Sequence, residues 1–165
     1  MSFEIKTESP TNGPAIEALL DQAFGPDREN KTSYRYRTAA GPIPSLCRLA
    51  VEGGQIIGSI RYWPISIEPG GRPALLLGPL AVDDDHRAMG IGKALVDDTL
   101  AKASELGHRI VFLVGDPVFY RRFGFVPAPA DLTMPGESSA RLMVRLLGNG
   151  GTIEAGTLCA IGPAD

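Results

Sequence analysis

One stretch of the sequence, residues 73–106, constrains the fold more than any other part of the chain. It opens with an apolar run that ends at Val82, continues through a polar turn with glycines, and closes with a segment of helical periodicity. An apolar run without alternation indicates a strand covered on both faces, and apolar positions spaced by about 3.6 residues indicate a helix. A strand, a glycine-bearing turn and a helix in this order suit phosphate, because the first N–H groups of a helix lack partners and its dipole favours negative charge there.

The sequence on either side of this stretch predicts a mixed sheet within one domain, residues 1–165. Strands are expected at residues 3–6, 46–52, 55–68, 74–82, 109–114, 140–147 and 154–161. Helices are expected at residues 13–24, 28–40 and 88–106, with a fourth of at most two turns that starts after Asp116. The long helix would cross over between two parallel strands. Trp63 and Pro64, inside the longest strand, predict a bulge or an edge feature.

Composition excludes several classes of function. A net charge of -3 argues against a nucleic-acid-binding protein, which usually carries a basic face. The start of the chain lacks the apolar segment of a signal peptide, and no apolar run is long enough to span a membrane, so we expect a cytoplasmic protein. Cys47, Cys159 and the two histidines are too far apart in sequence for a typical zinc site, so no metal is expected.

The turn matches neither of two well-known phosphate-binding motifs. A P-loop would have Ser or Thr for magnesium where this chain has Ala94, and glycine where it has Arg87. A dinucleotide fingerprint would need a third glycine where this chain has Leu95. Gly90 and Gly92 could also serve only to let the helix pack closely on the sheet, and for Gly92 both roles remain open.

Two motifs together resemble those of the GNAT superfamily of N-acetyltransferases. Arg87, Gly90 and Gly92 match its Arg-x-x-Gly-x-Gly signature after the strand that ends in Leu-Ala-Val, and residues 119–125 match its downstream tyrosine motif. Residues 77–82 and 115–117 are similar to the YhbS-like branch. The resemblance implies an α/β fold of the α+β type: a mixed, mostly antiparallel central sheet of about seven strands, with a V-shaped splay between the fourth and fifth strands and about four flanking helices.

The resemblance also implies that acetyl-CoA is the co-substrate and that no metal takes part. The turn would hold the pyrophosphate on backbone N–H groups, and the pantetheine arm would lie in the splay and pair with the backbone of Leu80 and Val82. The residues implied to bind the cofactor are Leu80, Ala81, Val82, Arg87, Ala88, Met89, Gly90, Ile91, Gly92 and Lys93. Leu113 stands where many members have an asparagine that contacts pantetheine.

In this family a neutral amine attacks the thioester directly, which requires an oxyanion donor and a proton for the leaving sulfur. Tyr120 matches the general acid, although an aromatic ring that only packs would also fit, and the backbone N–H near Leu80 matches the oxyanion donor. Gly78 and Pro79 stand where many members carry an acidic or histidine residue, so no general base is evident. Asp116 is a candidate whose capping role suffices to explain it, and deprotonation by solvent is the other option.

The acceptor is expected to be a primary amine, on a small molecule or a peptide, held by the first two helices and the longest strand. The candidate substrate residues are Tyr34, Arg61 and Trp63, with Arg35, Tyr36, Arg37 and Tyr62 nearby. Arginine with aromatic residues could accept an acidic or aromatic molecule. Two alternatives remain: a module that binds acetyl-CoA without turnover, and transfer of a longer acyl group. The edges of the final strands need cover, which leaves a homodimer open.

Overall fold

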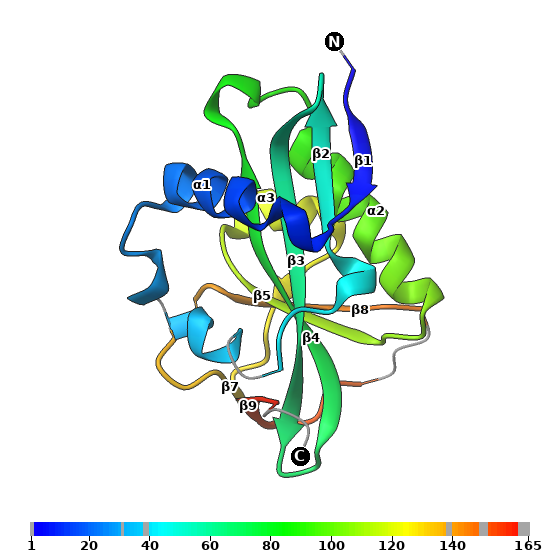
Figure 1. The fold of residues 1–165 in the computed structure, drawn as a ribbon. Helices are drawn as coiled ribbons and strands as arrows, with labels where there is room; N and C mark the ends of the chain where they lie inside the picture. The colour runs from blue at the N-terminus through cyan, green and yellow to red at the C-terminus, as the bar shows by residue number, and fades with distance from the viewer. Residues whose placement is uncertain (1, 31, 38–39, 138–139, 149–151, 162–165) are drawn as a thin grey trace.

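The computed structural model describes residues 2–30, 32–37, 40–137, 140–148 and 152–161, and places every strand among them in one mixed sheet (Figure 1). The strand order is β1-β2-β3-β4-β5-β8-β6, and β9 pairs with β3 and β7. The strands are β1 (Glu4–Thr7), β2 (Arg48–Glu52), β3 (Gln55–Glu68), β4 (Arg72–Val82), β5 (Ile110–Val114), β6 (Val126–Pro127), β7 (Leu132–Thr133), β8 (Leu142–Leu146) and β9 (Gly156–Ala160). The α-helices are α1 (Gly13–Phe24), α2 (Ile91–Glu105) and α3 (Pro117–Tyr120). The predicted mixed sheet, mostly antiparallel, is confirmed, with two short strands, β6 and β7, in addition to the seven that were predicted.

The predicted splay lies between β4 and β5. These strands run parallel but share only two pairs of residues, Leu75 with Val111 and Leu76 with Phe112. Beyond Leu76, β4 continues for six more residues beside β3 alone, with no registered partner on its β5 side within the described residues. The end of β4 and the end of β5 therefore diverge and leave space between two strands of one sheet.

A bulge in β4 lies beside this splay. Ile60 of β3 faces Leu80, and Tyr62 faces Leu77. Gly78 and Pro79 of β4 therefore lie opposite the one β3 residue between Ile60 and Tyr62. The Trp63 indole Nε1 donates a hydrogen bond of 2.6 Å to the Gly78 carbonyl oxygen, which fixes the bulge from the neighbouring strand. The bulge thus sits in β4 rather than at Trp63 itself.

Pro64 of β3 occupies an edge position, as one of the two interpretations of this segment predicted. On the side of β3 away from β4, pairing with β2 ends at Ile60 and pairing with β9 begins at Ile65. The missing N–H of proline therefore falls where neither strand needs a donor.

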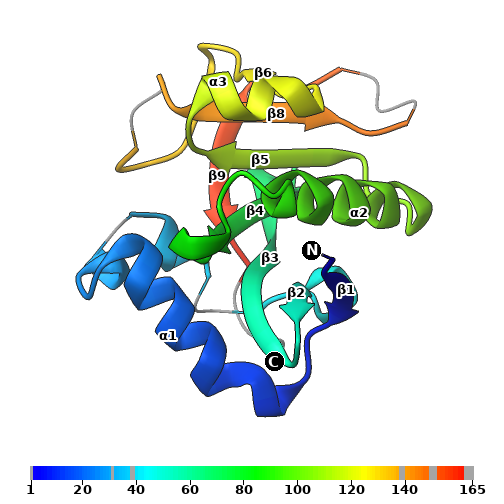
Figure 2. The same ribbon diagram turned by 90° about the horizontal axis from the view of Figure 1, so that it is seen from above.

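The helices α1 and α2 cover opposite faces of β3 and β4 (Figure 2). Ile16 and Leu20 of α1 pack with Leu49 and Ala81 on one face, and the apolar side of α2 packs on the other. The close approach of α2 depends on Gly58, where a Cβ would lie 2.8 Å from Ile91 Cγ2. A Cβ at Gly92 would make ordinary contacts of 3.5 Å and longer. Packing therefore requires glycine at position 58 and does not require it at position 92.

The predicted second helix at residues 28–40 is wrong. The described part contains two 3-10 helices, Arg28–Asn30 and Thr32–Tyr36, and residues 31, 38 and 39 lie outside the described residues. The segment has no continuous apolar stripe and is anchored by single side chains instead. Arg28 reaches back to α1, and the buried Tyr36 hydroxyl donates to the Leu158 carbonyl oxygen at 3.3 Å.

Two other boundaries differ from the prediction. α2 begins at Ile91 rather than at residue 88, because Ala88 and Gly90 have φ angles of 71° and 77°, which a right-handed helix cannot contain. The final strands pair with different partners, β8 with β5 and β6, and β9 with β3 and β7, so the short β6 and β7 cover part of their edges. Residues 149–151 of the predicted connection between them lie outside the described residues.

Candidate functional site

The turn between β4 and α2 presents backbone N–H groups at a helix start. Ala88 and Gly90 adopt left-handed φ angles, and the first intrahelical hydrogen bond runs from Ala94 N to Gly90 O at 3.0 Å. Gly90 is the N-cap residue of α2, and within the described residues no side chain accepts a hydrogen bond from the first N–H groups of the helix. The first turn of α2 also carries no acidic residue. Successive N–H groups that curl in this way form a concavity for anions. A non-glycine residue such as Ala88 in the left-handed region costs free energy, and such strain is typical of ligand-binding turns.

The charged side chains of the turn are exposed and weakly held. Arg87 Nη2 lies 3.0 Å from Asp84 Oδ1, and Lys93 Nζ lies 2.6 Å from Asp97 Oδ2, both at the surface. Exposed ion pairs of this kind contribute less than about 1 kcal/mol, so either side chain can turn to another anion. Ile91, in contrast, is 1% exposed in the core and offers a ligand only its backbone.

A histidine ties the start of the turn to the end of β2. His86 Nδ1 lies 2.8 Å from Asp83 Oδ2, and Nε2 lies 3.3 Å from Glu52 Oε1. The hydrogen bond with Asp83, supported by Glu52, raises the pKa of His86, and the same bond lowers the pKa of Asp83. Asp83 is buried while Asp84 and Asp85 are exposed, so only part of the acidic run at residues 83–85 is exposed to solvent.

A cavity of about 490 Å³ occupies the splay between β4 and β5. The residues that line it come from the β4 bulge, the end of β5, α3 and the segment after α1: Phe24, Arg28, Tyr34, Arg37, Leu77, Gly78, Pro79, Leu80, Val114, Gly115, Asp116, Tyr120, Glu137 and Arg141. It joins one predicted cofactor residue, Leu80, to the predicted general acid, Tyr120. The other predicted cofactor residues line the turn and the end of β4 outside this cavity.

Tyr120 is held in a cluster of aromatic rings at one side of this cavity. Its ring lies edge-on to Phe119 and Phe125, with centroids 4.9 and 6.0 Å apart. Gly115 makes room for it, since a Cβ there would lie 2.7 Å from Tyr120 Cε2. Burial raises the pKa of the Tyr120 phenol to about 12, while the nearby positive charge of Arg37 works in the opposite direction. The phenol therefore keeps its proton at neutral pH, facing a cavity beside the end of β4.

Asp116 caps α3. Its Oδ1 accepts a hydrogen bond of 2.9 Å from the Val118 N–H, which confirms the predicted capping role. Its side chain also lines the splay cavity, where Glu137 is the other carboxylate among the lining residues.

A second cavity, of about 420 Å³, adjoins the first and is lined by all three predicted acceptor residues, Tyr34, Arg61 and Trp63. Its remaining lining residues are Glu17, Leu20, Arg28, Glu29, Arg35, Arg37 and Pro79. Four residues line both cavities: Arg28, Tyr34, Arg37 and Pro79. The structure thus brings together side chains from α1, the 3-10 helices, β3 and the β4 bulge.

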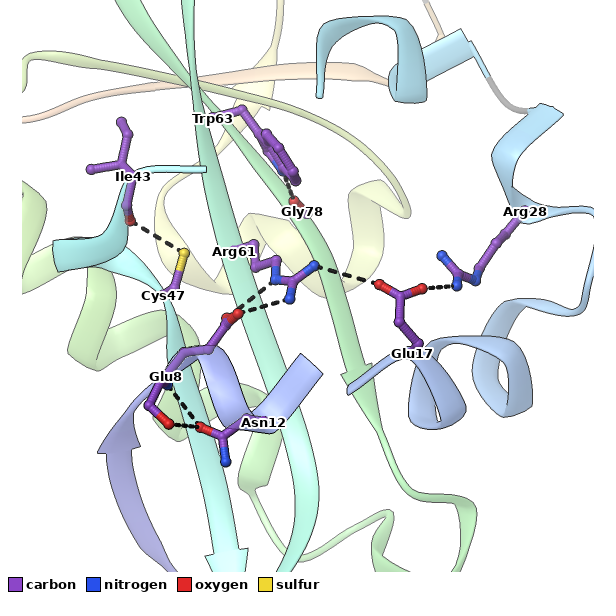
Figure 3. Close-up of polar contacts among 10 residues, drawn as sticks. Glu8, Asn12, Glu17, Arg28, Ile43, Cys47, Arg61, Trp63 and Gly78 are labelled. Atoms are coloured by element: carbon purple, nitrogen blue, oxygen red, sulfur yellow. Dashed lines mark hydrogen bonds and ion pairs between the residues drawn. The ribbon is translucent and has the colours of Figure 1, made fainter. Parts of the chain in front are cut away.

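Most polar atoms of this second cavity are already engaged by the protein itself (Figure 3). Arg61 donates two hydrogen bonds to the Glu8 carboxylate, at 2.7 and 3.1 Å, and also lies 3.9 Å from Glu17. Arg28 donates to Glu17, to Asp21 at 2.9 Å and to the Tyr34 hydroxyl at 2.5 Å. Trp63 uses its N–H on the β4 bulge. These contacts join α1, the 3-10 helices and β3 in one wall of the cavity.

Sequence reasoning missed several lining residues. Arg28 stands in a polar segment with no motif, and its partner Glu17 lies on α1, so only the tertiary fold joins them. Glu137 and Arg141 come from the segment that follows β7, far from every motif in sequence. Gly115 had a local signal, because a glycine between a buried strand and the Asp-Pro start of a helix indicates a close approach.

Within the described residues, no three His, Cys, Asp or Glu side chains gather as they would around a metal ion. In the same residues no helix is both long and apolar enough to cross a membrane.

Comparison with known proteins gives a consistent family. The domain family described as "Acetyltransferase (GNAT) domain" matches residues 44–127. The chain is similar to the uncharacterized N-acetyltransferase YhbS of Escherichia coli K12, 34% identical over 145 residues that cover 86% of each chain. It is also similar to the uncharacterized N-acetyltransferase YjhQ of the same organism, 30% identical over 88% of this chain and 84% of the relative.

Two solved structures share the fold over most of their length. One is E. coli YhbS in complex with CoA, with a TM-score of 0.76, 30% identity, and coverage of 94% of this chain and 88% of that one. The other is a GNAT family acetyltransferase from Brucella melitensis in complex with acetyl-CoA, with a TM-score of 0.73, 25% identity, and coverage of 97% and 96%.

Proposed function

Because the chain belongs to the GNAT acetyltransferase family, we propose that residues 1–165 form a single domain that transfers the acetyl group of acetyl-CoA to a primary amine. The observation that carries the proposal is the splay cavity, where the Tyr120 phenol and the end of β4 line one space next to a second, acceptor-sized cavity. The relatives crystallised with CoA and acetyl-CoA support the choice of co-substrate.

The chain has groups that suit the pyrophosphate and the pantetheine arm of acetyl-CoA. The N–H groups of residues 88–93 would hold the pyrophosphate, with the Arg87 and Lys93 side chains beside them. The unpaired side of β4, at Leu80 and Val82, offers N–H and C=O groups to the amides of the pantetheine arm. Acetyl-CoA supplies an acetyl thioester that a neutral amine can attack directly.

Tyr120 is the proposed general acid. Its phenol keeps its proton because burial raises its pKa, and it can hydrogen-bond to the sulfur as negative charge develops there. Arg37 favours this step, since its positive charge acts against the effect of burial on the Tyr120 phenol. A backbone N–H near Leu80 is the proposed donor to the oxygen on which charge develops.

The proton that the amine loses needs an acceptor. Gly78 and Pro79 offer none, and the Asp116 carboxylate is committed to the start of α3. Glu137 lines the same cavity and is the candidate to accept the proton through solvent.

The proposal is tested by titrating the protein with acetyl-CoA in a calorimeter and by following CoA release with a panel of primary amines. We expect saturable binding, and release of CoA that depends on at least one amine. Binding without release on any amine would favour a sensor of acetyl-CoA. Faster release from longer acyl-CoA thioesters would instead identify the protein as a different acyltransferase.

A further inference from the structure

Arg37 occupies the junction of the two cavities. It follows the 3-10 helix Thr32–Tyr36 and lines both the splay cavity and the acceptor cavity. A Cβ at Gly78 would lie 3.0 Å from Arg37 Nη2, so the guanidinium sits directly over the β4 bulge. Its positive charge also acts to lower the pKa of the Tyr120 phenol. Arg37 is therefore next to the place where the proposed reaction occurs.

The charge of Arg37 is not balanced by the protein, unlike that of its neighbours. Arg28 pairs with Glu17 and Asp21, and Arg61 pairs with Glu8. Among the described residues, no carboxylate oxygen lies within 4.0 Å of the Arg37 guanidinium.

Arg37 contacts an aromatic ring instead of an anion. Its Cζ lies 4.9 Å from the centroid of the Tyr34 ring, and its buried Nε has no hydrogen-bond partner. Burial lowers the pKa of this guanidinium to about 10, because a charge removed from water without a counter-ion is unfavourable in free energy. A partly buried cation without a counter-ion in a native structure calls for an explanation, and a ligand anion that reaches it from the cavities supplies one.

We propose that the acceptor is a primary amine that also carries a carboxylate, and that Arg37 binds this carboxylate and so directs the amine toward the β4 bulge. The inference rests on the proposed acetyl transfer and specifies its substrate class. A guanidinium binds a carboxylate through two parallel hydrogen bonds, which fixes orientation as well as position.

The surrounding charges favour a single negative charge on the ligand. The acceptor cavity already contains Glu17 and Glu29, and the splay cavity contains Asp116 and Glu137. Arg35 lines only the acceptor cavity and Arg141 only the splay cavity, so at the junction Arg37 is the arginine without a carboxylate partner within the described part of the chain. A carboxylate matches that single charge, whereas a phosphate monoester would bring a second charge close to the acidic lining.

The first experiment compares matched acceptors by CoA release: free amino acids, the corresponding amino acid carboxamides, and a phosphate monoester such as phosphoethanolamine. We expect kcat/KM to be at least about 10-fold higher for the carboxylates, in line with a charged hydrogen-bonded pair. The amine of a carboxamide is less basic than that of the free amino acid, so more of it is in the neutral form that attacks the thioester. This effect alone would favour the carboxamides, which is the opposite of the expected preference. Equal kcat/KM for acids and amides, or a preference for the phosphate, would overturn the inference and leave the acetyl transfer intact.

The second experiment uses Arg37→Met and Arg37→Lys, with Arg109→Met, at an exposed position just before β5, as the matched control. In Arg37→Met we expect the preference for carboxylates to fall about 10-fold or more through the acceptor KM, with the KM for acetyl-CoA unchanged. Arg37→Lys should keep part of the preference, and the control should keep all of it. An increase in the KM for acetyl-CoA, or an equal loss of rate on acids and amides, would contradict the assignment.

Stability separates a ligand-binding role of Arg37 from a structural one. Arg37→Met removes an unpaired buried charge, so we expect its Tm without ligand to equal or exceed that of the unaltered protein. A clear drop in Tm would indicate that Arg37 supports the fold.

Direct binding distinguishes failure of the inference from failure of the proposed function. N-acetyl amino acids and their carboxamides are titrated into the protein and into Arg37→Met. Carboxylate-dependent binding that Arg37→Met abolishes, without turnover on any amine, would retain the carboxylate site and refute the transferase. Turnover with no difference in binding between acids and amides would retain the transferase and refute the carboxylate site.

Discussion

The turn at residues 83–93 and the wall of the acceptor cavity use opposite means to prepare for a ligand. The turn offers backbone N–H groups, with exposed charged side chains in weak surface pairs. The wall pairs the charge of Arg61 with Glu8 and that of Arg28 with Glu17, whereas Arg37 has no carboxylate partner among the described residues.

This difference predicts how each region responds to change. The turn depends on the φ angles at Ala88 and Gly90 and should tolerate replacement of its charged side chains. The wall depends on pairs of side chains from distant segments and should tolerate small backbone adjustments better than the loss of one partner. Tyr120 lines the splay cavity, which shares four lining residues with the acceptor cavity, so its replacement is expected to have the largest effect on the site.

The largest expected effect is that of Tyr120→Phe on turnover. Without the phenolic proton, kcat should fall by about 10² to 10⁴, the usual contribution of a general acid. The KM values for acetyl-CoA and amine should change little, because the ring still fills its aromatic cluster. Steady-state CoA release measures all three constants. An unchanged kcat would reduce Tyr120 to a packing residue.

The next effect concerns the paired wall. Arg61→Met leaves the Glu8 carboxylate, whose side chain is 15% exposed, without its two hydrogen bonds. The free energy of unfolding should fall by about 2–3 kcal/mol, somewhat below the cost of breaking a fully buried pair. Urea unfolding measures it, with Arg87→Met in the turn as the control, expected to change stability by less than about 0.5 kcal/mol. Equal losses in both variants would abolish the contrast between wall and turn.

A smaller effect is expected for the backbone of the turn. Gly90→Ala places a Cβ at a φ of 77°, which costs about 1–2 kcal/mol and should weaken acetyl-CoA binding as the turn relaxes. Gly92→Ala, inside α2 with room for a Cβ, should instead raise stability by about 0.5–1 kcal/mol. Thermal unfolding and calorimetry report the two quantities. Identical behaviour of the two glycine variants would show that the φ angle of the turn is unimportant.

The smallest effect is a pH dependence at the start of the turn. The pKa of His86 is raised by Asp83 and Glu52, so its contribution to stability is complete below the ordinary histidine pKa of about 6.5 and is lost as pH rises through the raised value. Tm should therefore decrease as pH rises above about 6.5, and His86→Gln should flatten this part of the profile. The same pH profile of Tm in both proteins would show that the charge of His86 does not contribute to stability.

The same contrast explains which features could be predicted from sequence. The bounds of α1 and β3, the Asp116 cap and the splay depend on local patterns or on a contiguous motif, and the structure confirms them. The segment at residues 28–40 was predicted incorrectly, because its structure depends on single anchors such as the bonds of Arg28 to α1. Propensity alone does not reveal such tertiary anchors.

The acceptor wall shows the same limit for the site. Tyr34, Arg61 and Trp63 were expected near one another, and they line one cavity. Nothing in the amino-acid order distinguishes a paired arginine from an unpaired one, since Glu8 and Arg61 are 53 positions apart. The balance of charge, which singles out Arg37, exists only once the chain is folded.

The short pairing of β4 with β5 has a consequence for aggregation. An unpaired strand edge at the outside of a sheet invites another chain to pair with it, and proteins usually cover or charge such edges. Here the free edge of β4 beyond Leu76 lies in the middle of the sheet and opens into a cavity closed on one side by Tyr120. The protein can offer strand-like hydrogen bonds to a narrow ligand while denying them to a second polypeptide, which is too wide to enter between two strands of the same sheet.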